Sequence, residues 1–254
     1  SLGQLRMGVN DLRSKTLTRL SGPDLKTIII RPEGRPPIML QRTEQTAWEV
    51  LRRQGWKQAN LDAVTDLISA VNRDQVQKFV TDAATDLTSY GLDQPFLQIA
   101  FISLNNEGMR IAFGKAPEND HIFAHVVGRP NILQISPETL GKIPQSSWEW
   151  RTSHVWHLPK VDISQIVIRN AGSPLIELSY NHFAGSWSAT QNGIDATASL
   201  NPNRADKFLT YLESLQTKHW LGPMHPQAMK ALGNPDVTIS VSIRRINDEG
   251  QEMP

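Results

Sequence analysis

An internal repeat constrains the fold of this chain more than any other feature of its sequence. Residues 2–42 align with residues 140–180 at a constant shift, which places the segment LKTIIIRPEGRPPIML on ISQIVIRNAGSPLIEL. Further along, the shift changes by only a few residues, and each change falls in a loop. The later matches are Trp48 with Trp187, Leu67 with Phe208, Ile99 with Ile239, and LNNEG at 104–108 with INDEG at 246–250. This regularity predicts a duplicated structural unit.

Each unit begins with residues that alternate between apolar and polar, which is the period of a half-buried strand. Gly34 and Gly172, each followed by a proline, interrupt this pattern, so we expect each segment to form a β-hairpin. A third short strand carries the tryptophan, in TAWEVL at 46–51 and in GSWSAT at 185–190.

After the third strand, apolar residues recur at helical spacing, which predicts a helix with one face on the sheet. Asn60 and Asn201 stand where the N-cap of each helix is expected, and Pro202 suits the first helical position. Gly222 and Pro223 predict the end of the second helix. The apolar positions are Val64, Leu67, Ile68 and Val71 in the first unit, and Ala205, Phe208, Leu209, Leu212 and Leu215 in the second.

Four further strands are predicted after the first helix, in FLQIAFIS, MRIAFG, HIFAHVV and ILQIS, but only the first has a counterpart in the second unit. The sequence therefore predicts an α+β fold of two tandem repeats, each a mainly antiparallel sheet with a helix packed on one face, the second repeat being incomplete. We place the first unit at residues 1–138 and the second at 139–254. Val237–Ile243 is then expected to be an edge strand, or to pair with another chain.

Composition narrows the classes of function. The chain of 254 residues has a net charge of +1 with no run of like charges, so we expect no binding to nucleic acid. It contains no cysteine, which excludes disulfides and cysteine-ligated zinc. No apolar stretch is long enough to span a membrane, so we expect this chain to be soluble. Neither GxGxxG nor GxxxxGK[ST] occurs, and we expect no cofactor.

Three segments resemble a known bacterial family. SYGLDQP at 89–95, MRIAFGK at 109–115 and LRSKTLTRL at 12–20 are similar to the domain of unknown function numbered 4340, and the likeness extends over nearly the whole chain. The second unit departs from it, with ALGNP at 231–235 in place of GLDQP. The resemblance implies an envelope protein on the periplasmic side, with intact members tethered by an N-terminal membrane segment. It also implies genes near ABC-type transport systems linked to gliding motility, and it supplies no catalytic residues.

Two histidine pairs are candidates for chemistry. His121 and His125 lie near Glu118 and Asp120, but on a strand the two imidazoles would be roughly 13 Å apart at ~3.3 Å per residue, too far to share a metal. We therefore predict no metal site there and expect polar residues on the solvent side of a strand.

The second pair, His154 and His157, precedes Asp162, but its counterparts in the first unit are Thr16 and Arg19. No nucleophile signature such as G-x-S-x-G accompanies it, so we predict no catalytic triad.

Five other residues are candidates for ligand or partner binding. Trp148, Trp150 and Trp156 would suit an aromatic binding platform, although packing where the two units join is the stronger interpretation. Arg31 and Arg169 occupy matched positions at the end of the first hairpin strand. They would mark a symmetric anion site, or act as edge charges that discourage association between sheets, which we favour.

These patterns lead to two hypotheses of function. The first is a non-enzymatic extracytoplasmic binding or scaffold module with a protein partner in the envelope, an auxiliary part of an ABC-type transport or gliding-related assembly. The alternative is a hydrolase or metal-dependent enzyme whose site is assembled from distant His and Asp or Glu residues.

Overall fold

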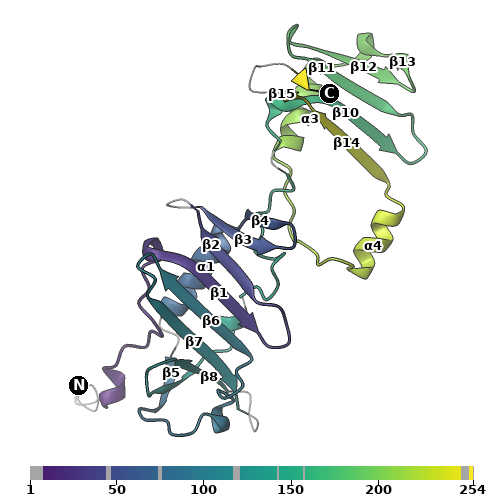
Figure 1. The fold of residues 1–254 in the computed structure, drawn as a ribbon. Helices are drawn as coiled ribbons and strands as arrows, with labels where there is room; N and C mark the ends of the chain where they lie inside the picture. The colour runs from purple at the N-terminus through teal and green to yellow at the C-terminus, as the bar shows by residue number, and fades with distance from the viewer. Residues whose placement is uncertain are drawn as a thin grey trace, which may run out of the picture. The chain divides into compact units, whose positions relative to one another are not determined.

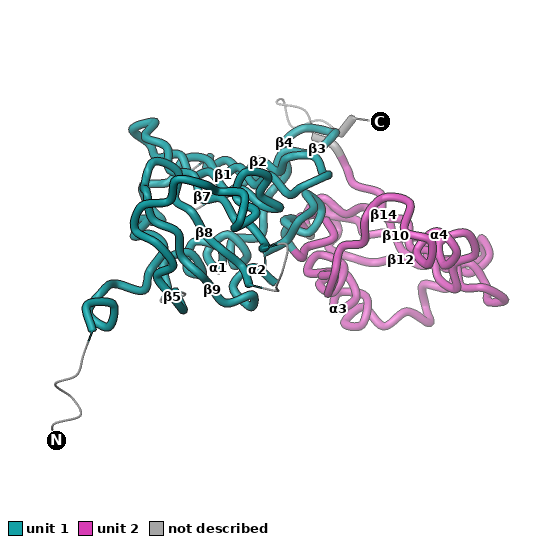
Figure 2. Tube along the Cα trace, turned by 90° about the horizontal axis from the view of Figure 1, so that it is seen from below, with its two compact units in different colours: residues 1–152 teal, residues 153–254 magenta. Residues whose placement is uncertain are grey.

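The computed structural model describes residues 8–43, 47–73, 76–116, 121–141, 143–156, 158–246 and 252–253. The chain divides into two compact units, residues 1–152 and 153–254 (Figure 2). This division lies later than the boundary predicted between 138 and 139, because the intervening residues pack on the first unit. Leu140, Ile143 and Trp150 belong to its core, and the N–H of Asn60 donates to the carbonyl of Trp150 at 2.7 Å.

Unit 1 is a nine-stranded sheet with the order β4-β3-β2-β1-β6-β7-β8-β9-β5, in which neighbouring strands are antiparallel. Helix α1 (Leu61–Asn72) lies behind the sheet (Figure 1) and buries Val64, Leu67 and Val71 against it. The strands are β1 Leu25–Pro32, β2 Ile38–Arg42, β3 Trp48–Arg52, β4 Gly55–Gln58, β5 Val76–Thr81, β6 Leu97–Ser103, β7 Gly108–Lys115, β8 Ile122–Val126 and β9 Ile132–Ile135. The short helices are η2 Val9–Asp11, η3 Gly22–Asp24, η4 Thr88–Tyr90 and α2 Glu138–Gly141.

Unit 2 is a five-stranded antiparallel sheet with the order β13-β12-β11-β10-β14. Helix α3 (Pro202–Glu213) buries Ala205, Leu209 and Leu212 in its core. The strands are β10 Ile163–Asn170, β11 Ile176–Asn181, β12 Ser186–Gln191, β13 Ile194–Asp195 and β14 Val237–Ile243, with β15 Arg245–Ile246 and β16 Glu252–Met253 forming a separate pair. The remaining helices are α4 Pro226–Gly233, η5 Lys160–Asp162 and η6 Thr197–Ser199.

The two units share one strand register. In the hairpins, Ile28 pairs with Leu40 and Ile166 with Leu178, which are matched positions of the repeat. The strand after the helix then pairs with the first strand, β6 with β1 and β14 with β10, and the register shifts by one residue at the same place in both ladders. These pairings confirm the predicted hairpins and the α+β repeat.

Both predicted helix N-caps are confirmed. The side chain of Asn60 accepts hydrogen bonds from two N–H groups of the first turn of α1, and that of Asn201 accepts one from Arg204 in α3. The predicted end of the second helix at Gly222 was wrong. The N–H and hydroxyl of Ser214 both donate to the carbonyl of Thr210, and α3 ends at Glu213.

The tryptophans of the third strands are packed differently in the two units. In unit 1, the guanidinium of Arg42 lies 4.8 Å from the centroid of the Trp48 ring and donates to the carbonyl of Leu25, and burial lowers the pKa of Arg42. In unit 2, Tyr180 takes the matched position, 4.9 Å from the ring of Trp187. An aromatic contact therefore replaces a cation over the ring.

Two of the family-like segments meet in unit 1, where the loop before β6 crosses β7. A Cβ atom on Gly114 of β7 would lie 2.3 Å from the carbonyl oxygen of Tyr90, and one on Gly91 would lie 2.3 Å from that of Lys115. Backbone therefore touches backbone, and the contact places Leu92 in a small core of its own, where it is 5% exposed. In ALGNP of unit 2 the match of Leu92 is Leu232, which is 73% exposed because unit 2 has no counterpart of β7 among its described residues.

We predict that Gly114→Ala destabilises unit 1 by about 1–3 kcal/mol or more, because the new methyl group has to displace backbone. Gly108→Ala, on the same strand with open space around its Cβ position, is the matched control. Urea unfolding of both variants measures the difference. Equal free energies of unfolding would contradict the close contact.

Candidate functional site

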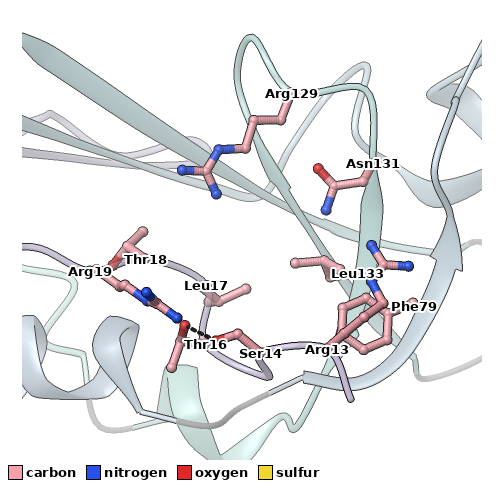
Figure 3. A pocket seen from close by; sticks show the side chains of 10 residues that line it. All are labelled: Arg13, Ser14, Thr16, Leu17, Thr18, Arg19, Phe79, Arg129, Asn131 and Leu133. Carbon is pink, nitrogen blue, oxygen red and sulfur yellow. Dashed lines mark hydrogen bonds between the residues drawn. The ribbon is translucent and has the colours of Figure 1, made fainter. Parts of the chain in front are cut away.

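A cavity of about 380 Å³ in unit 1 is the first candidate (Figure 3). It is bounded by the segment of residues 13–19, by Phe79 on β5, and by Arg129, Asn131 and Leu133 around the turn from β8 to β9. Figure 3 shows Arg129 on one side and Arg19 on the other, with Ser14 and Thr16 near Arg19. Within the described part of the chain, three arginines and no carboxylate line this cavity, so its charged lining is cationic.

Asn72, at the end of α1, holds the segment that forms one wall of the cavity. Its side-chain amide donates to the carbonyl of Leu20 at 2.7 Å, and its side-chain oxygen accepts from the N–H of Leu20 and from the hydroxyl of Thr18, each at 2.8 Å. The N–H of Thr18 also donates to the carbonyl of Val71. Leu17 and Thr18, which belong to this segment, are themselves buried, so the segment is held in place without a ligand.

Arg13 is already engaged within the protein. It forms a salt bridge with Asp82, 2.7 Å between Nη2 and Oδ1, and its guanidinium lies 3.9 Å from the centroid of the Phe79 ring. Arg19 and Arg129 are both exposed, and the described residues offer neither of them a carboxylate partner. These two guanidinium groups are therefore the ones that face the cavity with unmatched charge.

The edge of unit 2 is the second candidate. Strand β14 has β10 on one side and no partner on the other among the described residues, which confirms the predicted edge strand. The carbonyl of Asp236 accepts from Ala171, and the N–H of Arg244 donates to Asp162, both toward the β10 side. Since this direction alternates along a strand, Val237 and the odd-numbered residues after it turn their backbone N–H and C=O groups outward.

Two of the three predicted tryptophans contribute to the cores of the units, Trp150 in unit 1 and Trp156 in unit 2. Trp150 is fully buried in unit 1, and its indole N–H donates to the carbonyl of Pro144 at 3.0 Å. Trp156 packs against the core of unit 2 and donates to the carbonyl of Leu212. Trp148 is half-buried.

The two predicted arginines stand on interior strands. Arg31 lies on β1, between β2 and β6, and Arg169 lies on β10, between β11 and β14. The favoured role as edge charges was therefore wrong, because the strand after each helix covers the edge that the hairpin alone would leave open. Arg31 borders an open trough of about 480 Å³ that also includes Ile29 and Arg110.

The described histidines of the two predicted pairs each contact a different neighbour. His121 contacts Gln134, and Nδ1 of His125 lies 3.4 Å from the carbonyl oxygen of Asn131. His154 contacts Gln216, while Glu118, Asp120 and His157 fall outside the described residues. The described residues contain no group of three side chains suited to a metal. Likewise, none of their helices is long and apolar enough to cross a membrane.

We predict that Trp150→Ala lowers the free energy of unfolding by about 3–5 kcal/mol, because it removes a fully buried indole from the core of unit 1. Trp148→Ala should cost less, since that ring is half-buried. Urea unfolding compares the two variants. A Trp150→Ala protein as stable as the parent would contradict a packing role.

We also predict that Asn72→Ala loosens the cavity wall and costs about 1–3 kcal/mol, since it leaves backbone groups of Leu20 unpaired. Asn60→Ala, which removes the cap at the other end of α1, is the control for general loss of stability. Limited trypsin digestion should cleave faster after Arg19 in the Asn72 variant alone. Equal rates of cleavage after Arg19 in both variants would contradict the role of Asn72 in holding the segment of residues 13–19.

Comparison with protein families matches the chain to the family described as "Domain of unknown function (DUF4340)", over residues 1–95 and again over residues 48–235. No curated protein and no solved structure matches the chain. The matches cover most of the sequence, and the appearance of the family twice agrees with the repeated register of the two sheets. The chain therefore belongs to the DUF4340 family.

Proposed function

We propose that this chain is a non-enzymatic scaffold module of the bacterial cell envelope, on the periplasmic side, that joins another chain to its sheet at β14. The single observation that supports this is that one edge of β14 has no partner strand among the described residues, while Val237–Ile243 carries no charge and no proline. Soluble proteins usually protect such an edge, and strand addition is a common mode of protein recognition. The envelope location and the link to ABC-type transport or gliding rest on the family resemblance.

A second copy of this chain is the partner that fits β14 best. If two β14 strands pair in antiparallel fashion about Ser240, Val237 lies opposite Ile243, and Asp236 lies opposite Arg244 of the other copy. In this register each apolar residue of β14 lies opposite an apolar residue of the other copy, and each serine or threonine lies opposite another hydroxyl. The oppositely charged side chains of Asp236 and Arg244 lie opposite each other at both ends of the strand pair. The outward N–H and C=O groups fall in the hydrogen-bonded pairs of this register, as a two-fold symmetric interface requires.

The alternative, a hydrolase or metal enzyme, would require distant His and Asp or Glu side chains to meet. The contacts of His125 and His154 give that proposal no support, because each points to a different neighbour.

We predict a dimer that Ser240→Lys dissociates, because two lysines would then face each other across the symmetry axis. Ser240 is exposed, so the fold should survive. Mixing Ser240→Lys with Ser240→Glu should restore the dimer through opposite charges. Ser188→Lys, at an exposed position on β12, is the matched control and should leave the dimer unchanged. Sedimentation velocity over a range of concentrations measures the association.

A parent protein that stays monomeric at every concentration would show that the partner is not a second copy. A dimer that survives Ser240→Lys would show that copies associate through another surface. Either result would overturn the proposed pairing.

A further inference from the structure

The arginine-lined cavity of unit 1 offers donors for an anion from two sides. Arg129 reaches it from the turn between β8 and β9, and Arg19 reaches it from the segment held by Asn72 (Figure 3). Ser14 and Thr16, joined by a 2.8 Å hydrogen bond between their hydroxyls, add polar groups on the Arg19 side. A site with two guanidinium groups and hydroxyls around one space suits an anion with several oxygen atoms.

The base of the cavity is apolar. Leu17 and Leu133 are buried, and the ring of Phe79 is half-buried beneath Arg13. A volume of about 380 Å³ is in the range of pockets that hold small organic molecules. A ligand that fills this space would place an apolar or ring-shaped body on these side chains and its charged group between the arginines.

We propose that this cavity binds an organic phosphate, with the phosphate between Arg19 and Arg129 and the organic body against Leu17, Leu133 and Phe79. A phosphate presents three terminal oxygens in a tetrahedral arrangement, which meets donors from opposite sides of the cavity. A carboxylate presents two oxygens in one plane and reaches fewer of these donors. The site belongs to unit 1 alone, because Thr16 and Arg19 are matched by His154 and His157 in the repeat.

Hydrogen bonds and a salt bridge within the protein hold the wall of the cavity in place without a ligand. The hydrogen bonds of Asn72 fix the segment that carries Arg19, and the salt bridge to Asp82 fixes Arg13 over Phe79. Little conformational entropy therefore remains to be lost there when a ligand binds. Arg13 keeps its internal partner and acts as part of the wall.

Isothermal titration with phenyl phosphate and benzoate tests the proposal, since the two share a ring and differ in the anionic group. We expect saturable binding of phenyl phosphate and at least about tenfold weaker binding of benzoate, because the phosphate accepts more charge-assisted hydrogen bonds. Binding should weaken from pH 7 to pH 5, since a phosphate monoester loses its second charge near about pH 6 while arginine stays charged. Equal binding of both compounds would overturn the assignment to phosphate.

Arg19→Ala and Arg129→Ala should each weaken phenyl phosphate binding by about tenfold or more. Arg35→Ala removes an exposed arginine in the turn between β1 and β2 and is the matched control for net charge. Both cavity arginines are exposed, so thermal unfolding of the variants should match that of the parent. Unchanged affinity in both variants would overturn the proposal, whatever the oligomeric state of the chain.

Two sources can supply the same phosphate chemistry. Glycerol 3-phosphate represents a soluble metabolite, and vesicles of phosphatidylcholine with phosphatidic acid represent a lipid headgroup. Binding of either, lost in the Arg19→Ala variant, supports the site and identifies the source. Failure of phenyl phosphate, glycerol 3-phosphate and the vesicles to bind would overturn it.

Discussion

The pairing of the first strand of each unit with the strand after the helix is the constraint on which the rest of the fold depends. A hairpin with one neighbouring strand gives a helix little surface to cover, and a small sheet of this kind is marginal by itself. Once β6 joins β1, Ile28, Ile30 and Ile99 lie side by side and lose all contact with solvent. The same closure in unit 2 removes Ile163 and Ile166 from solvent. The cavity of unit 1 and the edge of β14 in unit 2 both belong to the sheets that these strand pairings complete.

Beyond this closure the two units differ. Unit 1 continues into β7, β8 and β9, which pair in turn and finally receive β5, so its sheet grows on the side where unit 2 keeps a free edge. This growth buries Leu92 and creates the wall opposite Arg19, whereas Leu232 and Met229 on α4 stay exposed. Comparison of the two copies therefore explains both candidate surfaces. The cavity of unit 1 is formed in part by strands β5 and β9, which follow β6 in its sheet. The described part of unit 2 has no strands that match these, and β14 is left at the edge of its sheet.

Much of the fold could be predicted from the sequence, because alternation, helical spacing and N-caps are local signals. Asn60, Asn201 and the edge strand β14 are examples. Strands β4, β5 and β13 were missed, since GWKQ and ID are short and polar and β5 gains its partner from β9 at a distance. Helix α4 was missed as well. Of INDEG at 246–250, only Ile246 lies within the described residues, so the predicted second copy of the turn stays a prediction.

The candidate sites were harder to predict than the fold. Arg13 and Arg129 are far apart in the chain, and no local pattern indicates that a turn between two strands will face the LRSKTLTRL segment. The two arginines in that segment were the only signal. The role of Arg31 was misjudged for a related reason, because the neighbours of a strand depend on the closure of the whole sheet. The local sequence predicts which face of a strand is buried, but it does not predict which strands lie on either side of it.

The pairing of β10 with β14, which are far apart in the chain, also bears on how fast unit 2 can fold. In unit 2 the hairpin of β10 and β11 joins residues close in sequence, whereas Ile163 and Ile243 also pair although helices α3 and α4 separate them in the chain. Contacts of this separation carry a large loop-closure entropy and slow folding. We therefore expect β14 to join the sheet late. In a single copy of the chain, the amide protons of its outward-facing, odd-numbered residues should exchange with solvent faster than those of the residues that are bonded to β10.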